Sequence, residues 1–241
     1  MIFKNTYTIG IEDIGKSNFA TNKAILSIME DVACKHGADL KYGVNNLSKT
    51  KQAWILLNWK MKVLERPVYN DNVCAYTWSR KFEKAYACRD FKLKGDDGRV
   101  YAIGTSRWLL FDIETRRPVR LNKEIEDLYG TEKGIDVFED EIYDIRPDLE
   151  VIKKSQKSIY KVQRRDIDIN GHVHNTNYLE IAYEMLPWEI YESKSFENIE
   201  ITYKKEIRYG DEVTCCYYTH NDNHFVAMMV GDRVNAVVSF K

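Results

Sequence analysis

The sequence predicts an α+β protein built from two similar repeats, each a helix packed on an antiparallel sheet. The order of one strand, one helix and several further strands occurs twice along the 241 residues. Apolar residues recur at helical spacing in two segments and mostly alternate in the others. Because one helix can cover one face of one sheet, two repeats account for the whole chain. Two unrelated α+β domains are the alternative that this pattern leaves open.

The first repeat is expected over residues 1–130. A strand in "NTYTIGI" precedes a helix in "ATNKAILSIMEDVACKHGADL", where Ile25, Met29 and Val32 follow the helical period and Gly37 is the expected end. Strand-like runs follow, with turn signals at residues 70–71 and 95–98: "LNWKMKVL", "NVCAYTWSR", "KAYACRDFKLK" and "VYAIGTSRWLLFDIET".

The second repeat is expected over residues 151–241, after an acidic and irregular connector at 131–150. Its strand "SIYKVQRRDID" leads into a helix in "NTNYLEIAYEML", where Asn177 and Glu180 have the spacing of a capping box and Pro187 should end the helix. Four more strand-like runs close the chain. We expect the two sheets to join edge to edge, since this would hide two exposed edges.

Composition excludes several classes of partner. The net charge is about −1, so no global field attracts nucleic acid or an anionic membrane. No apolar run approaches the roughly 20 residues of a membrane helix. The beginning, "MIFKNTYTIGIEDIG", lacks a signal core and a transit leader, which favours a bacterial cytoplasmic protein. The five cysteines fit no metal spacing and are interpreted as reduced thiols, so no metal or cofactor is expected.

The stretch "DIDINGHVHNTNY" (166–178) concentrates carboxylates, amides and two of the five histidines. Asn170-Gly171 alone is a common hairpin signal, so a plain polar turn is one reading. In an extended conformation, however, Asp168, Asn170 and His172 would project to one side, just before a helix N-terminus that can stabilise an oxyanion. Such a set of groups suits the attack of water on an acyl group. Metal binding is disfavoured because no further ligands lie at suitable spacing.

Aligning the repeats on Tyr7 and Tyr160 reveals an asymmetry. Inert residues of the first repeat fall opposite reactive residues of the second: Gly15, Ser17 and Phe19 opposite Asp168, Asn170 and His172. We therefore expect the second repeat to perform the chemistry and the first to bind substrate.

Nearly the whole chain resembles the acyl-ACP thioesterases, as a bacterial-type relative of the plant enzymes with their double hotdog fold. Three segments carry the resemblance in order: "TSRWLLFDIETRRPVRL", "DIDINGHVHNTNYLEIAYEMLP" and "ITYKKEIRYGDEV". It implies a catalytic group of Asp168, Asn170, His172 and Glu206. Without the resemblance, Glu206 would be interpreted as a solvent-facing charge.

The sequence departs from the plant pattern at three positions near this group. Ile207 stands where plant members have a cysteine, which argues against a covalent acyl-enzyme because isoleucine is no nucleophile. Gly171 replaces a glutamine, and His174 replaces an asparagine and has no assigned role. Cys215 and Cys216 lie in the next strand and are interpreted as packing residues.

The resemblance implies hydrolysis of a thioester with release of a fatty acid. Glu206 would act as general base on water with a pKa raised by burial or by Asp168, and His172 would polarise that water. Asn170 would orient the water or the carbonyl, and Asp168 would position Asn170. The implied partner is acyl carrier protein (ACP) with a phosphopantetheine-linked acyl chain, and a homodimer is possible.

Two further sets of residues are candidates for substrate contacts. The acyl chain is expected in the first repeat, although core packing explains its candidate residues at least as well: Ile25, Met29, Trp54 and Leu56. Basic pairs beside the proposed site could receive the acidic carrier, although a solvated charged face is the simpler reading of each pair: Arg164-Arg165 and Lys204-Lys205.

Three rival functions remain open on the sequence. A hotdog acyl-CoA thioesterase would perform the same chemistry on another carrier. An enoyl-thioester hydratase would add water across a double bond on the same scaffold. A non-enzymatic acyl-thioester sensor would need a DNA-binding segment, and the sequence has neither a helix-turn-helix pattern nor a basic arm.

Overall fold

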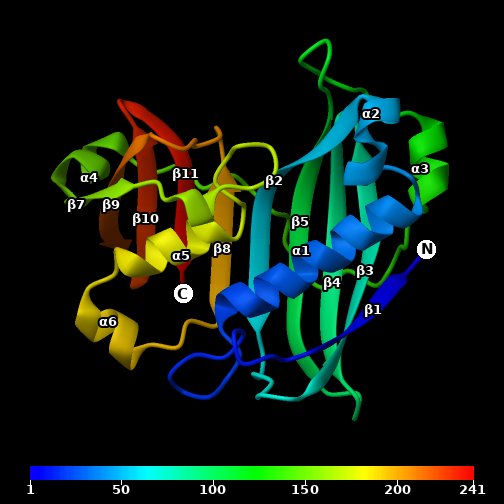
Figure 1. Ribbon diagram of the computed structural model, residues 1–241. Helices are drawn as coiled ribbons and strands as arrows, with labels where there is room; N and C mark the ends of the chain where they lie inside the picture. Colours follow the sequence, from blue (N-terminus) through cyan, green and yellow to red (C-terminus); the bar gives the residue numbers. More distant parts are fainter. The chain divides into compact units, whose positions relative to one another are not determined.

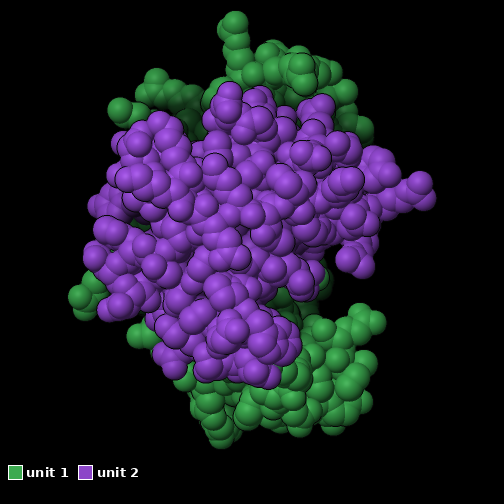
Figure 2. All heavy atoms as spheres, turned by 90° about the vertical axis from the view of Figure 1, so that its left-hand side faces the viewer, with its two compact units in different colours: residues 1–142 green, residues 143–241 purple.

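The computed structural model describes residues 1–241 and divides them into two compact units, residues 1–142 and 143–241 (Figure 2). The boundary lies inside the stretch predicted as an acidic connector. Each unit contains an antiparallel sheet and a helix that follows its first strand, as the α+β class predicts. None of the helices combines the length and the apolar composition needed to cross a bilayer.

The first unit is built around five antiparallel strands and a short sixth strand. Its strands are β1 (Phe3–Thr8), β2 (Gln52–Val63), β3 (Asn72–Glu83), β4 (Tyr86–Gly95), β5 (Val100–Asp112) and the short β6 (Arg117–Pro118). Its helices are α1 (Asn22–Asp39), the 3₁₀ turn η1 (Val44–Asn46), α2 (Leu47–Thr50) and α3 (Lys123–Tyr129). The strands pair in the order β1-β3-β4-β5-β2, with β6 beside β5, and α1 lies across one face of this sheet (Figure 1).

Helix α1 begins as predicted and ends later than predicted. The side chain of Thr21 caps it by accepting a hydrogen bond from the Ala24 N–H at 3.1 Å. Ile25 and Met29 are fully buried on the face that meets the sheet. The predicted end at Gly37 is wrong, because the helix continues to Asp39. Gly37 is itself buried, and packing of this last turn outweighs the low helix propensity of glycine.

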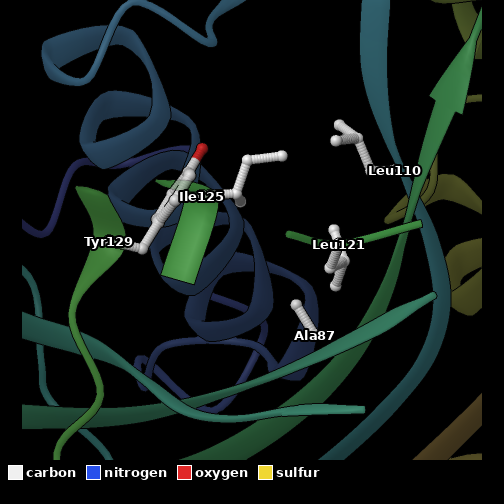
Figure 3. Close-up of a cluster of buried hydrophobic side chains, with 5 residues drawn as sticks. All are labelled: Ala87, Leu110, Leu121, Ile125 and Tyr129. Atoms are coloured by element: carbon white, nitrogen blue, oxygen red, sulfur yellow. The ribbon is translucent and has the colours of Figure 1, made fainter. Parts of the chain in front are cut away.

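An apolar cluster, which we call the α3 cluster, packs α3 against β4 and β5 (Figure 3). Tyr129 lies at one end of it and accepts a hydrogen bond from Trp54 Nε1 at 2.8 Å. The buried members are Ala87, Leu110, Leu121, Ile125 and Tyr129.

The last part of the first unit is irregular and tied to the sheet by polar contacts. Glu141 pairs with Arg80 of β3 at 3.1 Å, and Asp140 pairs with Lys60 of β2 at 2.5 Å. The Val137 N–H donates to the buried Asp90 carboxylate of β4 at 3.2 Å. The acidic residues of this stretch therefore neutralise basic side chains of the first sheet.

The second unit contains five antiparallel strands. Its strands are β7 (Gln156–Lys161), β8 (Asn198–Tyr203), β9 (Glu212–His220), β10 (Asn223–Val230) and β11 (Arg233–Phe240). Its helices are α4 (Leu149–Lys154), the 3₁₀ turn η2 (Arg164–Asp166), α5 (Asn177–Glu184) and α6 (Trp188–Ser193). The strands pair in the order β8-β11-β10-β9-β7, and α5 lies across the face of β8 and β11 (Figure 1).

Helix α5 is shorter than the long helix predicted for the second repeat. It ends at Glu184, before Pro187, which begins the separate helix α6. The predicted capping box is also wrong: the N-cap is Thr176, and no side chain caps the helix. Asn177 instead donates from Nδ2 to the Asp166 carbonyl at 3.2 Å, which fixes the helix start to the preceding turn.

The two units repeat the same local hydrogen bonds at positions matched by the Tyr7–Tyr160 alignment. Asp13 accepts from the Gly10 N–H at 2.8 Å, and Asp166 accepts from the Gln163 N–H at 2.6 Å. Equivalent bridges then join residue 14 to 20 and residue 167 to 173. The turn before each helix therefore has the same backbone hydrogen bonds in both repeats, whereas its side chains differ.

Candidate active site

The residues predicted to do chemistry begin in a tight turn, not in an extended strand. The Asp168 N–H donates to the His172 carbonyl at 2.8 Å, and the Gly171 N–H donates to the Asp168 carbonyl at 3.1 Å. Gly171 has a φ of +78°, a conformation that glycine adopts without strain. The expected alternation of Asp168, Asn170 and His172 along a strand is therefore wrong, and the turn signal of Asn170-Gly171 was the correct local prediction.

The turn nevertheless gathers these groups around the Asp168 carboxylate. Oδ1 of Asp168 accepts from the Asn170 N–H at 2.8 Å and from the His172 N–H at 3.1 Å. Its Oδ2 accepts from the Asn170 side-chain amide at 3.3 Å. These three bonds orient the Asn170 amide and the His172 backbone, which fits the positioning role predicted for Asp168.

Glu206 reaches this turn from the loop between β8 and β9. The Val173 N–H donates to the Ile207 carbonyl at 2.8 Å, and His172 forms an antiparallel bridge with Arg208. The two residues paired with the His172 segment, Ile207 and Arg208, therefore directly follow Glu206 in the chain. Its carboxylate is 37% exposed and accepts a hydrogen bond from Arg208 Nη2 at 3.3 Å.

Two buried residues that sequence reasoning missed hold the Glu206 loop in place. The Tyr178 hydroxyl of α5 accepts from the Ile207 N–H at 3.1 Å. Asn235 of β11 donates from Nδ2 to the Glu206 carbonyl at 3.1 Å. Burial raises the pKa of Tyr178, and the nearby charges of Glu206 and Asp168 raise it further. The Tyr178 phenol thus feels the charge of both carboxylates, although nothing in the sequence pattern singles it out.

The pKa of Glu206 is lowered, opposite to the predicted direction. Burial alone would raise it, but a hydrogen bond from its own N–H and electrostatic interactions with Lys205, His172 and Arg208 outweigh burial. Partial exposure of the carboxylate explains why burial does not prevail. Glu206 is consequently ionised at neutral pH and has the protonation state that a base needs.

The start of α5 differs from that of α1 in its capping. Thr21 caps α1 with its side chain, whereas Thr176 makes no side-chain bond to the first turn of α5. The Thr176 hydroxyl instead contacts His174 Nδ1 at 3.0 Å. His174, which had no assigned role, therefore belongs to the turn that leads into the helix.

The cysteines of β9 are buried and remain free thiols. Cys215 and Cys216 are 1% and 0% exposed. Burial raises the pKa of Cys215 to about 12, so its thiol is not ionised at neutral pH. Ile207, at the position of the plant cysteine, is fully buried. None of these three side chains has the properties of a nucleophile.

The four basic candidates for carrier docking are exposed on the second unit. Arg164 and Arg165 lie in η2, just before the turn at residues 168–172, and Lys204 and Lys205 follow β8, just before Glu206. Since the 206–208 segment is paired with residues 172–173, both basic pairs flank the same local structure.

The four candidates for acyl-chain contacts lie in the first unit. Ile25, Met29 and Leu56 are buried, and Trp54 is half-buried. Met29 packs closely on β5, because a Cβ added to Gly104 would lie 2.9 Å from its sulfur. Core packing accounts for these positions, and a contact with substrate stays a prediction.

The first unit keeps the turn but replaces the reactive groups. Its Phe19 bridges to Val68 as His172 bridges to Arg208, and the Ala20 N–H bonds Pro67 as Val173 bonds Ile207. These matches place Arg66 at the position of Glu206. The Arg66 guanidinium donates to the Ala20 carbonyl at 2.9 Å and to Asn22 Oδ1 at 2.8 Å. The first unit thus presents a structural arginine where the second presents a carboxylate.

Comparison with known proteins identifies the family. The family model described as the acyl-ACP thioesterase N-terminal domain matches residues 1–129, and the C-terminal domain model matches residues 149–236. The chain belongs to the acyl-ACP thioesterase family. The resemblance inferred from the three motifs is confirmed.

Plant members of the family are among the similar proteins. Oleoyl-acyl carrier protein thioesterase 2 of Arabidopsis thaliana is 24% identical over 95% of this chain and 66% of its own length. Dodecanoyl-[acyl-carrier-protein] hydrolase of Umbellularia californica is 21% identical over 86% of this chain and 56% of its own length. The chain spans only about half to two thirds of the length of the plant relatives.

Solved structures confirm the double hotdog fold of the family. An acyl-ACP thioesterase from Bacteroides thetaiotaomicron has a TM-score of 0.85 at 20% identity and covers 99% of this chain and 96% of its own. The 12:0-ACP thioesterase from Umbellularia californica has a TM-score of 0.84 at 17% identity and covers 100% of this chain and 96% of its own.

Proposed function

We propose that this protein hydrolyses the thioester of acyl-ACP and releases a free fatty acid. Membership of the acyl-ACP thioesterase family supports the reaction class. The observation that carries the proposal is the pairing of the Glu206 loop with the His172 turn inside one unit. It brings together an ionised carboxylate, an imidazole and an amide from distant parts of the sequence.

In the proposed mechanism, Glu206 takes a proton from a water molecule polarised by His172. The water oxygen attacks the thioester carbonyl, and Asn170 with the N-terminal amides of α5 stabilises the developing oxyanion. Collapse of the tetrahedral intermediate breaks the carbon–sulfur bond, and the thiolate takes the proton back. Asp168, Tyr178 and Asn235 hold the reacting groups in position without touching the substrate.

The proposal assigns the two units different roles. The second unit performs hydrolysis, and the first unit binds the acyl chain through Ile25, Met29, Trp54 and Leu56. The acidic connector predicted at 131–150 separates the two repeats. We further propose that the phosphopantetheine-linked chain arrives on ACP, which docks on Arg164, Arg165, Lys204 and Lys205.

Release assays on carrier-matched substrates test this function. The same saturated acyl chain is presented on ACP and on coenzyme A, and free fatty acid is measured. We expect release from both thioesters with a higher kcat/KM on ACP. No release from either saturated thioester would contradict the proposal, since a hydratase or a binding protein cannot cleave them.

Charge reversal at the docking residues is expected to raise the KM for acyl-ACP by about tenfold at low salt and to leave kcat unchanged. Arg165→Glu and Lys204→Glu each place a like charge against an acidic carrier, and added salt should reduce the difference. Steady-state kinetics at two ionic strengths measures the effect. Lys153→Glu on α4 is the matched control, and acyl-CoA is the control substrate. An equal rise in KM for all three variants would exclude this docking surface.

The lowered pKa of Glu206 predicts where activity is lost at acid pH. A carboxylate with a depressed pKa keeps its base form until the pH falls through that pKa, so the Glu206 limb of kcat/KM should lie at a lower pH than that of an ordinary glutamate. Lys205→Gln removes one positive charge that depresses this pKa, and should move the limb to higher pH. Lys204→Gln is the neighbouring control. The profile is measured with a small thioester, so that docking plays no part, and an unmoved limb in Lys205→Gln would contradict the assignment.

A further inference from the structure

Arg89 is a buried cation in the interior of the first unit. It lies on β4 between Ala87 and Phe91 in the alternating pattern that faces α1, and it is 7% exposed. Its register partners are small, namely Ser79 on β3 and Ser106 on β5. Its guanidinium reaches α1, where Nη1 lies 2.9 Å from His36 Nδ1.

The contacts of Arg89 fix the tautomer of His36. A guanidinium can only donate, so Nδ1 of His36 accepts the bond and the ring proton lies on Nε2. Burial and the charge of Arg89 lower the pKa of His36 to about 3, so the ring is neutral at physiological pH. Nε2 is fully buried and has no hydrogen-bond partner. A buried N–H donor therefore lacks an acceptor beside a buried cation.

No counter-charge neutralises Arg89. Its Nη1 also donates to Thr77 Oγ1 at 3.1 Å, and the ionisable groups that bear on the pKa of Arg89 are Tyr129 and Cys34. Burial raises the pKa of both to about 12, so both are neutral, whereas the pKa of Arg89 is lowered only to about 10. Arg80 is equally buried but has a counter-charge, because it pairs with Glu141 at 3.1 Å.

We propose that Arg89 and His36 form a binding site for a carboxylate carried on an aliphatic chain. The carboxylate would supply the missing negative charge and accept from Arg89 and from His36 Nε2–H. The α3 cluster, whose Tyr129 ring lies 5.6 Å from the Arg89 guanidinium and 5.5 Å from the His36 ring, offers apolar contacts to the chain (Figure 3). The choice of an aliphatic chain rests on the proposed function, which places acyl groups in the first unit.

Two sources could supply this group. One is a free fatty acid, the product of the proposed reaction, whose binding here would inhibit or regulate the enzyme. The other is an acyl substrate that carries a second carboxylate at its far end. Both present the same chemistry to Arg89 and His36, and they differ in their effect on turnover.

Binding of decanoate to the full-length protein tests the site without turnover. Decanoate should raise the melting temperature and shift the His36 Nε2–H signal in NMR spectra, and its methyl ester should do neither. Arg89→Met should weaken decanoate binding by about tenfold or more. It should also raise the melting temperature of the ligand-free protein, because it removes an unpaired buried charge. Arg80→Met is the matched control and should lower the melting temperature while retaining decanoate binding, because it breaks a pair.

The outcomes distinguish the two sources of the carboxylate from each other and from the absence of a binding site. If decanoate inhibits hydrolysis of acyl-ACP in the wild type but not in Arg89→Met, the site binds the fatty acid product. If the wild type hydrolyses an acyl-ACP with a terminal carboxylate faster than the same chain with a terminal methyl group, and Arg89→Met does not, the site binds the far end of the substrate. Equal binding of decanoate to wild type and Arg89→Met, or no shift of the His36 signal, would overturn the site. If the protein hydrolyses acyl-ACP but does not bind decanoate, the proposed site is wrong and the proposed function stands. If it binds decanoate but does not hydrolyse acyl-ACP, the proposed function is wrong and the site stands.

Discussion

Glu206→Gln is expected to lower kcat by about 10²–10⁴-fold, since it removes the group that accepts the proton from water. Glutamine keeps the size of the side chain and can still accept a hydrogen bond from Arg208, so the loop should stay in place. His172→Ala should lower kcat by a similar factor, because the water loses its second partner. Single-turnover rates on acyl-ACP measure both effects.

Cysteine variants provide the control for this prediction. Cys215→Ala and Cys216→Ala should retain their rate, because both thiols are buried in β9 and Cys215 is protonated at neutral pH. Unfolding curves of all four variants verify that the fold is intact. Full activity in Glu206→Gln together with an inactive cysteine variant would reverse the assignment of the catalytic group.

Asp168→Ala is the second substitution with a large expected effect, a loss of about 10²-fold in kcat. It removes the acceptor of three hydrogen bonds that hold the Asn170 amide and the His172 backbone, and a misplacement of about 1 Å is enough for such a loss. Stopped-flow hydrolysis of acyl-ACP measures the rate, and KM should change little.

Asp168→Asn separates positioning from charge. The asparagine oxygen can still accept from the two backbone N–H groups, so this variant should recover most of the rate that Asp168→Ala loses. If Asp168→Asn were as slow as the alanine variant, the charge of Asp168 would act on the reaction directly and the positioning role would be wrong.

The repeat was predictable because its signals are local. The strand and helix periods, the turn residues and the Tyr7–Tyr160 alignment all depend on neighbours in sequence, and the structure repeats the hydrogen bonds of Asp13 at Asp166. Details that depend on packing were missed. Gly37 stays helical because its turn is buried, and Asn177 bonds a carbonyl of the preceding turn instead of capping its helix.

The site was predictable only in part, because its geometry depends on a contact between distant segments. Asp168, Asn170 and His172 share one short stretch, so their chemistry attracts notice, but the turn that gathers them was hidden by an apparent alternation. Glu206 was reached through the family resemblance alone. Tyr178 has no polar pattern around it and is recognisable only once its hydroxyl is seen to hold the Ile207 N–H.

The direction of the Glu206 pKa shift shows why composition cannot replace geometry. Burial was expected to raise this pKa, as it does for carboxylates in apolar pockets. The structure leaves the carboxylate 37% exposed beside Lys205, His172 and Arg208. A base of this kind relies on position more than on basicity, which increases the importance of the residues that hold the loop.

The asymmetry between the units follows from substitutions on a common backbone. Arg66 stands at the position that matches Glu206 and bonds the start of α1, so the first unit has a fixed helix entrance where the second has a carboxylate. Arg89 and His36 add a second polar feature to the interior of the same unit. Both features agree with the proposal that the first unit binds substrate or product and the second performs the chemistry.

A single turnover in water enriched in ¹⁸O tests the central claim most directly, that Glu206 activates water and does not attack the thioester itself. If Glu206 acts as a base, the fatty acid from the first turnover contains ¹⁸O, and the peptide with Glu206 has its natural mass. If Glu206 forms an anhydride that water opens at the enzyme's carbonyl, the fatty acid is unlabelled and the Glu206 peptide gains the ¹⁸O. Mass spectrometry of both products decides between them, and label in the Glu206 peptide would contradict the mechanism proposed here.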